Sequence, residues 1–384
     1  MFPTTRSLAT IALLLVGLFC VCASRAIAAP SDYFTITVVD DQTGRGVPLV
    51  ELRTTNQMVF VTDSRGVVAF NEPGLMDQKV YFSIKSHGYE VPADGFGNRG
   101  TALDVKPGGH AEIKIKRVNI AERLYRITGG GIYRDSILAG QPVPAKRPNL
   151  NGQVMGQDTV EVTPYKGKIY WFWGDTDRVS YPLGQFATSG ATSEMPGKGG
   201  LDPNVGVDLT YWVDADGFSK KMIPLPGPGV VWVGGLFTVN DKNGQERLLT
   251  HYSQRKGLGE ELSSGIALFD DAKAQFEPLV KLTSDAPLFP EGHPFRATQG
   301  GVPYIYFQPR NGEAIPCVRV RADWDHATDP RTYESFTCLT PGSRDDGDGS
   351  RLDRTADGHL RWAGNQIRPP SAPTDNARSS KPGR

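Results

Sequence analysis

The sequence has little of several features that would assign a function quickly. Its 384 residues include four cysteines and six histidines, and 42 Lys and Arg balance 42 Asp and Glu. This neutral balance argues against a partner such as nucleic acid, whose phosphate backbone attracts proteins with a basic excess. The sequence contains no His-Glu-x-x-His, Gly-x-Ser-x-Gly or Walker motif. Zinc-protease, serine-hydrolase and nucleotide-binding functions are therefore disfavoured, and no metal site is predicted.

Only one long apolar run is present, and it lies at the N-terminus. Arg6 precedes apolar residues 11–23, and Ala26-Ile27-Ala28 resembles a signal-peptidase cleavage site. Residues 1–28 therefore predict a secretory signal peptide. The alternative is a retained anchor, although the run is shorter than the roughly 20 residues that a span needs. With no later transmembrane segment, we expect the mature chain to be secreted, periplasmic or at the cell surface.

Export also changes how the cysteines are interpreted. Cys20 and Cys22 leave with the signal peptide, so only Cys317 and Cys338 remain, beside two strand-like runs in one hairpin-sized unit. In an oxidising compartment, a disulfide between them would contribute about 3 kcal/mol to stability. The alternative is a pair of buried free thiols. Zinc is not expected, because no other Cys or His falls at ligand spacing.

Glycine and proline are plentiful, with 44 and 29 residues. They favour many turns and short strands, and therefore an all-β fold. In residues 33–118, turn signals separate five short runs that are β-branched or alternating, as in a small antiparallel β-sandwich. These runs are 34–39, 49–53, 67–70, 80–84 and 111–115.

The same region resembles a known family. Residues 44–52, residues 62–70 and His87-Gly88-Tyr89 are similar to the carboxypeptidase-regulatory, or transthyretin-like, sandwich. The resemblance implies an accessory module that stabilises or positions a neighbouring domain, and it does not imply peptidase activity. Residues 119–151 are then expected to form a linker. Its Gly129-Gly130-Gly131 lacks the Gly-Lys-Ser/Thr ending and following helix of a phosphate loop, which favours a flexible connection.

Residues 152–365 contain a weak internal repeat. Hairpins expected at 157–173, 235–252 and 293–307 are each followed by a second strand pair. These pairs are expected at 209–213 with 221–223, at 265–269 with 278–280, and beside Cys317 and Cys338. A four-stranded unit that recurs in this way is typical of β-propeller blades. We count three blades and a partial fourth starting near residues 355–362. Residues 366–384 are rich in proline, serine and charge, and are expected to be disordered.

This second region resembles secreted, glycosidase-like β-propellers related in fold to arabinanases and levansucrases. The motif Gly156-Gln157-Asp158, followed by residues 170–176, carries that resemblance. It implies sugar cleavage or binding at the propeller axis. The expected architecture is a small antiparallel β-sandwich followed by an incomplete β-propeller. An open ring would expose sheet edges, through which two copies could associate edge to edge.

Candidate catalytic residues lie where innermost strands begin, because those positions face the shared axis. Asp158 occupies this level in the first blade, and Glu291 and His293 occupy it in the third. A pair of carboxylates is the usual apparatus of a glycosidase. We therefore assign Asp158 as nucleophile or base and Glu291 as acid, with His293 orienting or donating a proton. The alternative for Asp158 is a structural role, in which it caps backbone amides or braces a neighbouring blade.

The predicted substrate is a polysaccharide or cell-surface glycan, contacted by Gln157 and Trp173. For Trp173, the alternative is packing between blades. No cofactor is expected; the acidic run 345–349 could hold Ca²⁺ but lacks the spacing of a hand-type loop, which favours a solvated turn. The hypothesis is a glycoside hydrolase. The alternatives are a non-catalytic glycan- or protein-binding surface protein, and a truncated inactive homologue.

Overall fold

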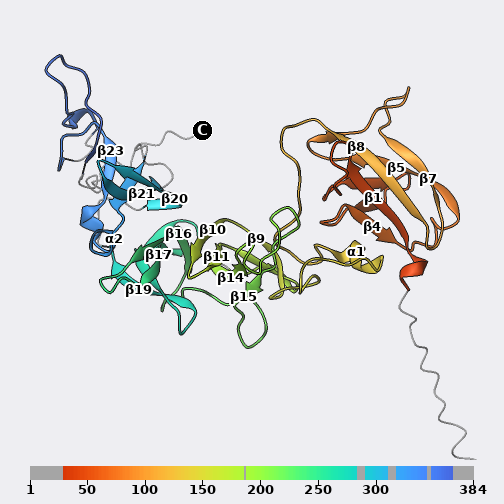
Figure 1. Ribbon diagram of the computed structural model, residues 1–384, viewed down its shortest axis with the longest axis horizontal. Helices are drawn as coiled ribbons and strands as arrows, with labels where there is room; N and C mark the ends of the chain where they lie inside the picture. The colour runs from red at the N-terminus through yellow and green to blue at the C-terminus, as the bar shows by residue number, and fades with distance from the viewer. Residues whose placement is uncertain (1–28, 186, 283–289, 310–316, 344–346, 366–384) are drawn as a thin grey trace, which may run out of the picture.

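The computed structural model describes residues 29–185, 187–282, 290–309, 317–343 and 347–365. They form six β-sheets and two short α-helices, so the predicted all-β class is confirmed. A two-sheet sandwich lies at one end of the molecule and an open, propeller-like series of blades extends away from it (Figure 1). The predicted signal peptide, the predicted disordered tail, and Asp345 and Asp346 of the acidic run lie outside the described residues.

The sandwich packs one sheet of order β4-β1-β8-β6 against another of order β3-β2-β5-β7. Its elements are the 3-10 turn η1 (Pro30–Asp32) and strands β1 (Phe34–Asp40), β2 (Glu51–Thr54), β3 (Val59–Val61), β4 (Val67–Phe70), β5 (Gln78–Lys85), β6 (Tyr89–Glu90), β7 (Gly100–Val105) and β8 (His110–Arg117). Phe70 contacts the rings of Phe34, Phe60 and Phe82 in the core between the sheets. The sandwich is not purely antiparallel as expected. β1 and β8 pair in parallel, which is possible because the chain passes through the second sheet between them.

The linker contains a short helix, α1 (Arg134–Leu138), although no helix was expected after the three glycines. Two buried aspartates hold α1 against the sandwich. The Asp135 carboxylate accepts a hydrogen bond from the Ala69 backbone N–H at 3.0 Å, and Asp63 accepts one from the Ser136 N–H at 2.7 Å. Buried carboxylates need hydrogen-bond donors. Here α1 donates through the Ser136 N–H, and its Asp135 side chain accepts from the sandwich. This part of the linker is therefore tied to the sandwich.

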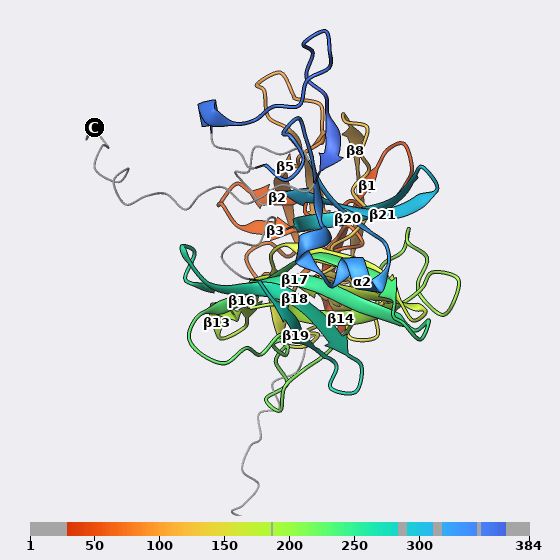
Figure 2. The same ribbon diagram turned by 90° about the vertical axis from the view of Figure 1, so that its left-hand side faces the viewer.

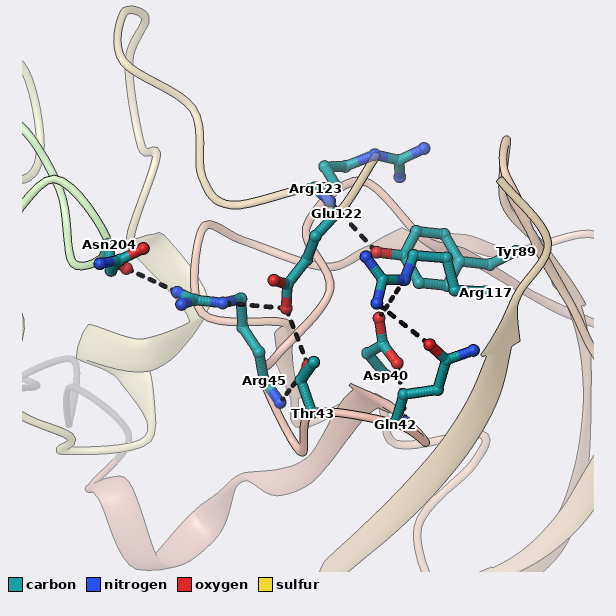
Figure 3. Close-up of polar contacts among 9 residues, drawn as sticks. All are labelled: Asp40, Gln42, Thr43, Arg45, Tyr89, Arg117, Glu122, Arg123 and Asn204. Carbon is teal, nitrogen blue, oxygen red and sulfur yellow. Dashed lines mark hydrogen bonds and ion pairs between the residues drawn. The ribbon is translucent and has the colours of Figure 1, made fainter. Parts of the chain in front are cut away.

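A polar network joins the sandwich, the linker and the propeller-like part (Figure 3). Glu122 of the linker accepts hydrogen bonds from Thr43 Oγ1 at 2.8 Å and Arg45 Nε at 3.1 Å. Arg45 Nη1 also donates to the backbone oxygen of Asn204, in a loop of the first blade, at 2.5 Å. A single guanidinium thus bridges three parts of the chain, which suits its several donors in fixed geometry.

Three blades follow, each with its strands in sequence order. The first blade consists of β10 (Val160–Tyr165), β11 (Lys168–Trp173), β14 (Ser189–Glu194) and β15 (Thr210–Tyr211); the second of β16 (Val230–Asn240), β17 (Glu246–Lys256), β18 (Glu260–Asp270) and β19 (Gln275–Lys281). The third consists of β20 (Pro290–Gln299), β21 (Val302–Pro309), β22 (Val318–Arg321), β23 (Glu334–Thr337) and β24 (Ala363–Asn365), with α2 (Trp324–Ala327), η2 (Pro330–Thr332) and η3 (Gly347–Gly349) in its connections. A separate sheet beside the first blade contains β9 (Val154–Gln157), β12 (Thr176–Arg178) and β13 (Tyr181–Gln185).

Apolar side chains fill the spaces between successive blades. Phe172 of the first blade packs in one cluster with Phe269 and Phe276 of the second. Phe237 of the second blade contacts Phe307 of the third at a ring distance of 5.4 Å. Figure 2 shows the second sheet and β20 and β21 of the third lying one over the other. The inner strands β10, β16 and β20 lie against one another, which defines the axial side.

Two expected details of the blades are wrong. The third strand of the first blade is β14, and residues 209–213, expected there, contribute only the short edge strand β15. Residues 355–362 do not begin a fourth blade. They form a turn that leads into β24, which pairs with β23 as the fifth strand of the third sheet.

The predicted disulfide is also absent, since Cys317 and Cys338 are both free. The strand register explains this difference. Val318 pairs with Ser335, so the continued register places Cys317 opposite Phe336 and leaves Cys338 two positions farther along. Diagonal neighbours in a sheet are separated by about 7–8 Å, beyond the Cα spacing at which a disulfide closes.

The free cysteines can be counted by mass spectrometry. A chain that begins at residue 29, denatured without reductant and treated with iodoacetamide, is expected to gain two carbamidomethyl groups. A chain that gains no carbamidomethyl group before reduction and gains two only after reduction would contradict the observed register.

Loss of the Arg45 bridge is expected to loosen the linker. Arg45→Ala removes the hydrogen bonds to Glu122 and Asn204, so chymotrypsin should cleave after Tyr125 several-fold faster than in the unmodified protein. Arg53→Ala is the matched control, because the ion pair of Arg53 with Glu51 lies within the sandwich. Equal cleavage rates for the two variants would show that the bridge does not hold the linker.

Candidate functional site

Glu161 is the buried carboxyl group at the meeting point of the inner strands. It lies on β10 opposite Phe172 of β11, and its side chain is 6% exposed. Alternation along β10 turns this residue inward, toward β16 and β20. His293 of β20 reaches toward it, with Nδ1 3.8 Å from Glu161 Oε2. The first and third blades thus each contribute an ionisable side chain to one place.

Irregular pairing in two inner strands shapes the site. The register of β16 shifts between Gly234 and Phe237, and that of β20 shifts between Glu291 and Phe295. Bulges redirect side chains and release backbone groups from the strand ladder. Gly235 has a φ of 65°, and a Cβ there would lie 3.1 Å from His251 Nδ1 and from the Phe307 ring. This bulge therefore requires glycine.

The surroundings of Glu161 keep it protonated. Burial raises its pKa to about 8; the backbone N–H of Leu236 lowers it, and the nearby Glu291 charge raises it further. At neutral pH the carboxyl is therefore mostly neutral and can donate a proton. Its Oε2 atom has no hydrogen-bond partner among the described residues.

His251 and Tyr333 support the bulge from behind. Both are fully buried, and burial lowers the pKa of His251 to about 3, so its ring is neutral. His251 Nε2 lies 3.1 Å from the Tyr333 hydroxyl, which donates to the Ala327 carbonyl oxygen at 2.9 Å. The ring also interacts with the Gly235 backbone. His251 is therefore a positioning residue for the bulge that carries the Leu236 N–H.

A cleft of about 280 Å³ opens beside Glu161, between the first blade and the beginning of β16. Asp158, Trp173, Asp175 and Trp232 line it together with Glu161. Trp232 Nε1 donates to Asp175 Oδ1 at 3.1 Å, which joins the two blades across the cleft. The cleft thus combines carboxyl groups with two indole rings.

Two of the predicted site residues, Asp158 and Trp173, line this cleft. Asp158 lines it with its side chain exposed, while its backbone pairs with Asp175 and Gly174. Glu291 and His293 lie on β20 beside Glu161 but are not among the described residues that line the cleft; Glu291 raises the pKa of Glu161, and His293 Nδ1 lies 3.8 Å from Glu161 Oε2. Trp173 is buried in the cleft wall and stacks on Trp171 with ring centres 6.2 Å apart. Their roles in chemistry stay predictions.

Gln157 lies apart from the cleft lining. Its side chain donates to Ser189 Oγ at 2.6 Å and accepts from the Tyr211 hydroxyl at 2.7 Å. These contacts join β9 to the first blade. The observed role of the Gln157 side chain is to take part in this internal network. Its contact with a substrate stays a prediction.

Sequence analysis did not single out Glu161. The sequence offered one signal for it. Glu161 stands between Val160 and Val162 in a predicted inner strand, and a charged residue is unusual at a buried position. The depth of its burial, however, depends on β16 and β20, which are distant in sequence. Among the described residues, no group of three potential metal ligands lies together, and no helix is long and apolar enough to cross a membrane.

A larger cavity, of about 350 Å³, lies between the linker and the outer face of the first blade. It contains Trp171 and two acidic side chains. Both acids are ion-paired, Asp208 with Lys146 at 3.3 Å and Glu194 with Lys168 at 2.7 Å. This cavity therefore lacks the buried, protonated carboxyl that distinguishes the axial cleft.

The raised pKa of Glu161 predicts a pH-dependent stability. Because its folded pKa lies above the ordinary value of 4.5, its contribution is fully present below pH 4.5 and is lost as pH rises toward about 8. The slope is at most about 1.4 kcal/mol per pH unit. Urea unfolding at pH 5, 6.5 and 8 should show this decline in the unmodified protein and a flatter profile in Glu161→Gln. Asp158→Asn is the control, and a profile unchanged by Glu161→Gln would contradict the assignment.

Comparisons with known proteins show only distant likeness. No protein-family model matches the chain, and no curated protein sequence is similar to it. One similar solved structure carries the description "The GH130 family of mannoside phosphorylases contains glycoside hydrolases that target beta-1,2 mannosidic linkages in Candida mannan"; it has 14% identity and a TM-score of 0.29 over 75% of this chain and 84% of that one. Another, described as "Glycoside hydrolase", has 11% identity and a TM-score of 0.25, and the match covers 73% of this chain and 74% of that one. The chain thus has weak structural similarity to glycosidase structures, while the transthyretin-like resemblance of the sandwich stays a prediction.

Proposed function

We propose that the axial cleft is a glycan-cleaving site and that the protein acts on a polysaccharide outside the cytoplasm. The observation that carries this proposal is the buried Glu161 carboxyl, whose pKa of about 8 leaves it protonated at neutral pH. The N-terminal signal-peptide pattern supports a location outside the cytoplasm.

Glu161 acts as the general acid in this proposal. Its proton passes to the glycosidic oxygen as the bond between that oxygen and the anomeric carbon breaks. The oxygen of a water molecule then bonds to the anomeric carbon, and one proton of that water passes to the carboxylate that acts as base. Burial maintains the proton on Glu161 at neutral pH, so the group is ready to donate when the glycan binds.

Glu291 supplies the second carboxylate, either as base toward the water or as nucleophile toward the anomeric carbon. It lies close enough to Glu161 for its charge to raise the pKa of that group. His293 is half exposed beside Glu161 and returns a proton to it between turnovers. Asp158, at the cleft mouth, positions the sugar in this arrangement.

A second candidate function is glycan binding without turnover. The 6% exposure of the Glu161 side chain favours it, because a general acid must reach the glycosidic oxygen. The indole-lined cleft would then serve recognition alone. The two functions differ in the expected effect of Glu161→Gln: it lowers turnover if the protein is an enzyme and leaves glycan binding unchanged if the protein only binds.

The proposal is tested by incubating the full chain with a panel of soluble plant, fungal and bacterial polysaccharides and measuring reducing ends. Glu161→Gln and Glu291→Gln should each lower the rate at least about 100-fold, because each removes a proton-transfer or nucleophilic group. Asp104→Asn, on the exposed side of β7 in the sandwich, is the matched control and should retain full activity.

Circular dichroism of each variant shows whether it remains folded. Turnover that survives in folded Glu161→Gln would remove Glu161 from the mechanism. If glycans bind and no panel member is hydrolysed by any form, the binding function replaces the catalytic one.

A further inference from the structure

The axial cleft holds two aspartates that have no charged partner among the described residues. Asp158, Asp175 and Glu161 line it, and no lysine, arginine or histidine is among its described lining residues. The partners of its two aspartates are neutral. Asp158 Oδ1 accepts from the Thr159 hydroxyl at 2.6 Å, and Asp175 Oδ1 accepts from the Trp232 indole at 3.1 Å.

The contrast with the larger cavity shows that this pattern is local. There, Lys146 and Lys168 neutralise both acidic side chains. In the axial cleft, the described residues supply no ion pair for Asp158 or Asp175. A cleft with one sign of charge attracts ligands of the opposite sign and repels those of the same sign.

The carboxyl group in the wall of the cleft offers a further point of contact for a ligand. Glu161 Oε2 is buried and has no hydrogen-bond partner among the described residues; His293 Nδ1 lies 3.8 Å from it, beyond hydrogen-bond distance. Leaving a buried polar atom without a hydrogen bond is unfavourable. A hydroxyl or amino group of a bound ligand would satisfy it.

The indole ring of Trp232 adds a second chemical preference. It lines the cleft and is partly exposed, and the hydrogen bond to Asp175 fixes its orientation, whereas Trp173 is buried in the cleft wall. Indole faces pack against the apolar faces of sugar rings and attract cations placed over them. Rings together with carboxylates suit a ligand that is both a sugar and positively charged.

We propose that the axial cleft selects glycans that carry free amino groups, such as a polymer of glucosamine. The inference relies on the proposed function for the statement that the ligand is a glycan. Asp158 and Asp175 contact the ammonium groups, the indole ring of Trp232 contacts a sugar face, and uronate-rich glycans are repelled.

Calorimetry at pH 6 and low salt tests this selectivity with four tetramers. They are glucosamine tetramer, its fully N-acetylated form, tetragalacturonate and tetralysine. The glucosamine tetramer should bind at least about tenfold more tightly than the neutral N-acetylated form, and tetragalacturonate should not bind. Raising the salt to 0.5 M should remove most of this preference, because exposed charges are screened.

Asp158→Asn and Asp175→Asn should each weaken binding of the glucosamine tetramer about fivefold. Binding of the neutral tetramer should not change. Asparagine keeps the Oδ1 acceptor that each aspartate offers to Thr159 or Trp232, so both variants should fold. Asp104→Asn in the sandwich removes the same charge far from the cleft and should have no effect.

Equal affinity for the charged and neutral tetramers, or no binding of the glucosamine tetramer, would overturn this inference. Tetralysine binding as tightly as the glucosamine tetramer would also overturn it, because the cleft would then recognise charge without a sugar. If neutral glycans are hydrolysed in a Glu161-dependent manner without charge preference, only this inference fails. If the glucosamine tetramer binds through Asp158 and Asp175 but no glycan is cleaved, only the catalytic proposal fails.

Discussion

The close approach of the inner strands β10, β16 and β20 is the constraint on which the site depends. Their backbones come together where Gly235 allows β16 to bulge, since any Cβ there would meet His251 and Phe307. The bulge turns the Leu236 N–H toward Glu161, and the register shift after Glu291 turns the side chains of β20 toward the same place. Apolar packing between the blades brings the strands together, while the bulges decide which polar groups face the axis.

Two kinds of carboxyl group share the cleft, and depth of burial separates them. Glu161 lies behind the surface and remains protonated because charging it without solvent is costly. Asp158 is exposed at the mouth, and Asp175 is fixed by an indole hydrogen bond. Under the proposals made above, the buried carboxyl group donates a proton, while the more exposed aspartates recognise positive charge.

The sandwich is joined to the linker and to the first blade by hydrogen bonds of a few side chains. Buried Asp63 and Asp135 hold α1 against it, and Arg45 connects it with both the linker and the first blade. These contacts are polar and few, whereas the blades are joined by clusters of aromatic and aliphatic side chains. The sandwich is therefore a separately packed unit beside the propeller-like part, positioned by directional hydrogen bonds.

The sequence by itself determined the all-β class, the sandwich region and the hairpins of the second and third blades, because alternation and turn residues act over a few positions. It also predicted one level for Asp158, Glu291 and His293, since inner strands of a repeat begin at equivalent positions. Glu291 and His293 lie beside Glu161, and Asp158 lines the cleft next to it. Tertiary structure alone decided the parallel pairing of β1 with β8, the diagonal offset of Cys317 and Cys338, and the position of β24. It also decided the burial of Glu161. The strands that pair and the solvent that a carboxyl loses depend on segments far away in the chain, which local patterns do not specify.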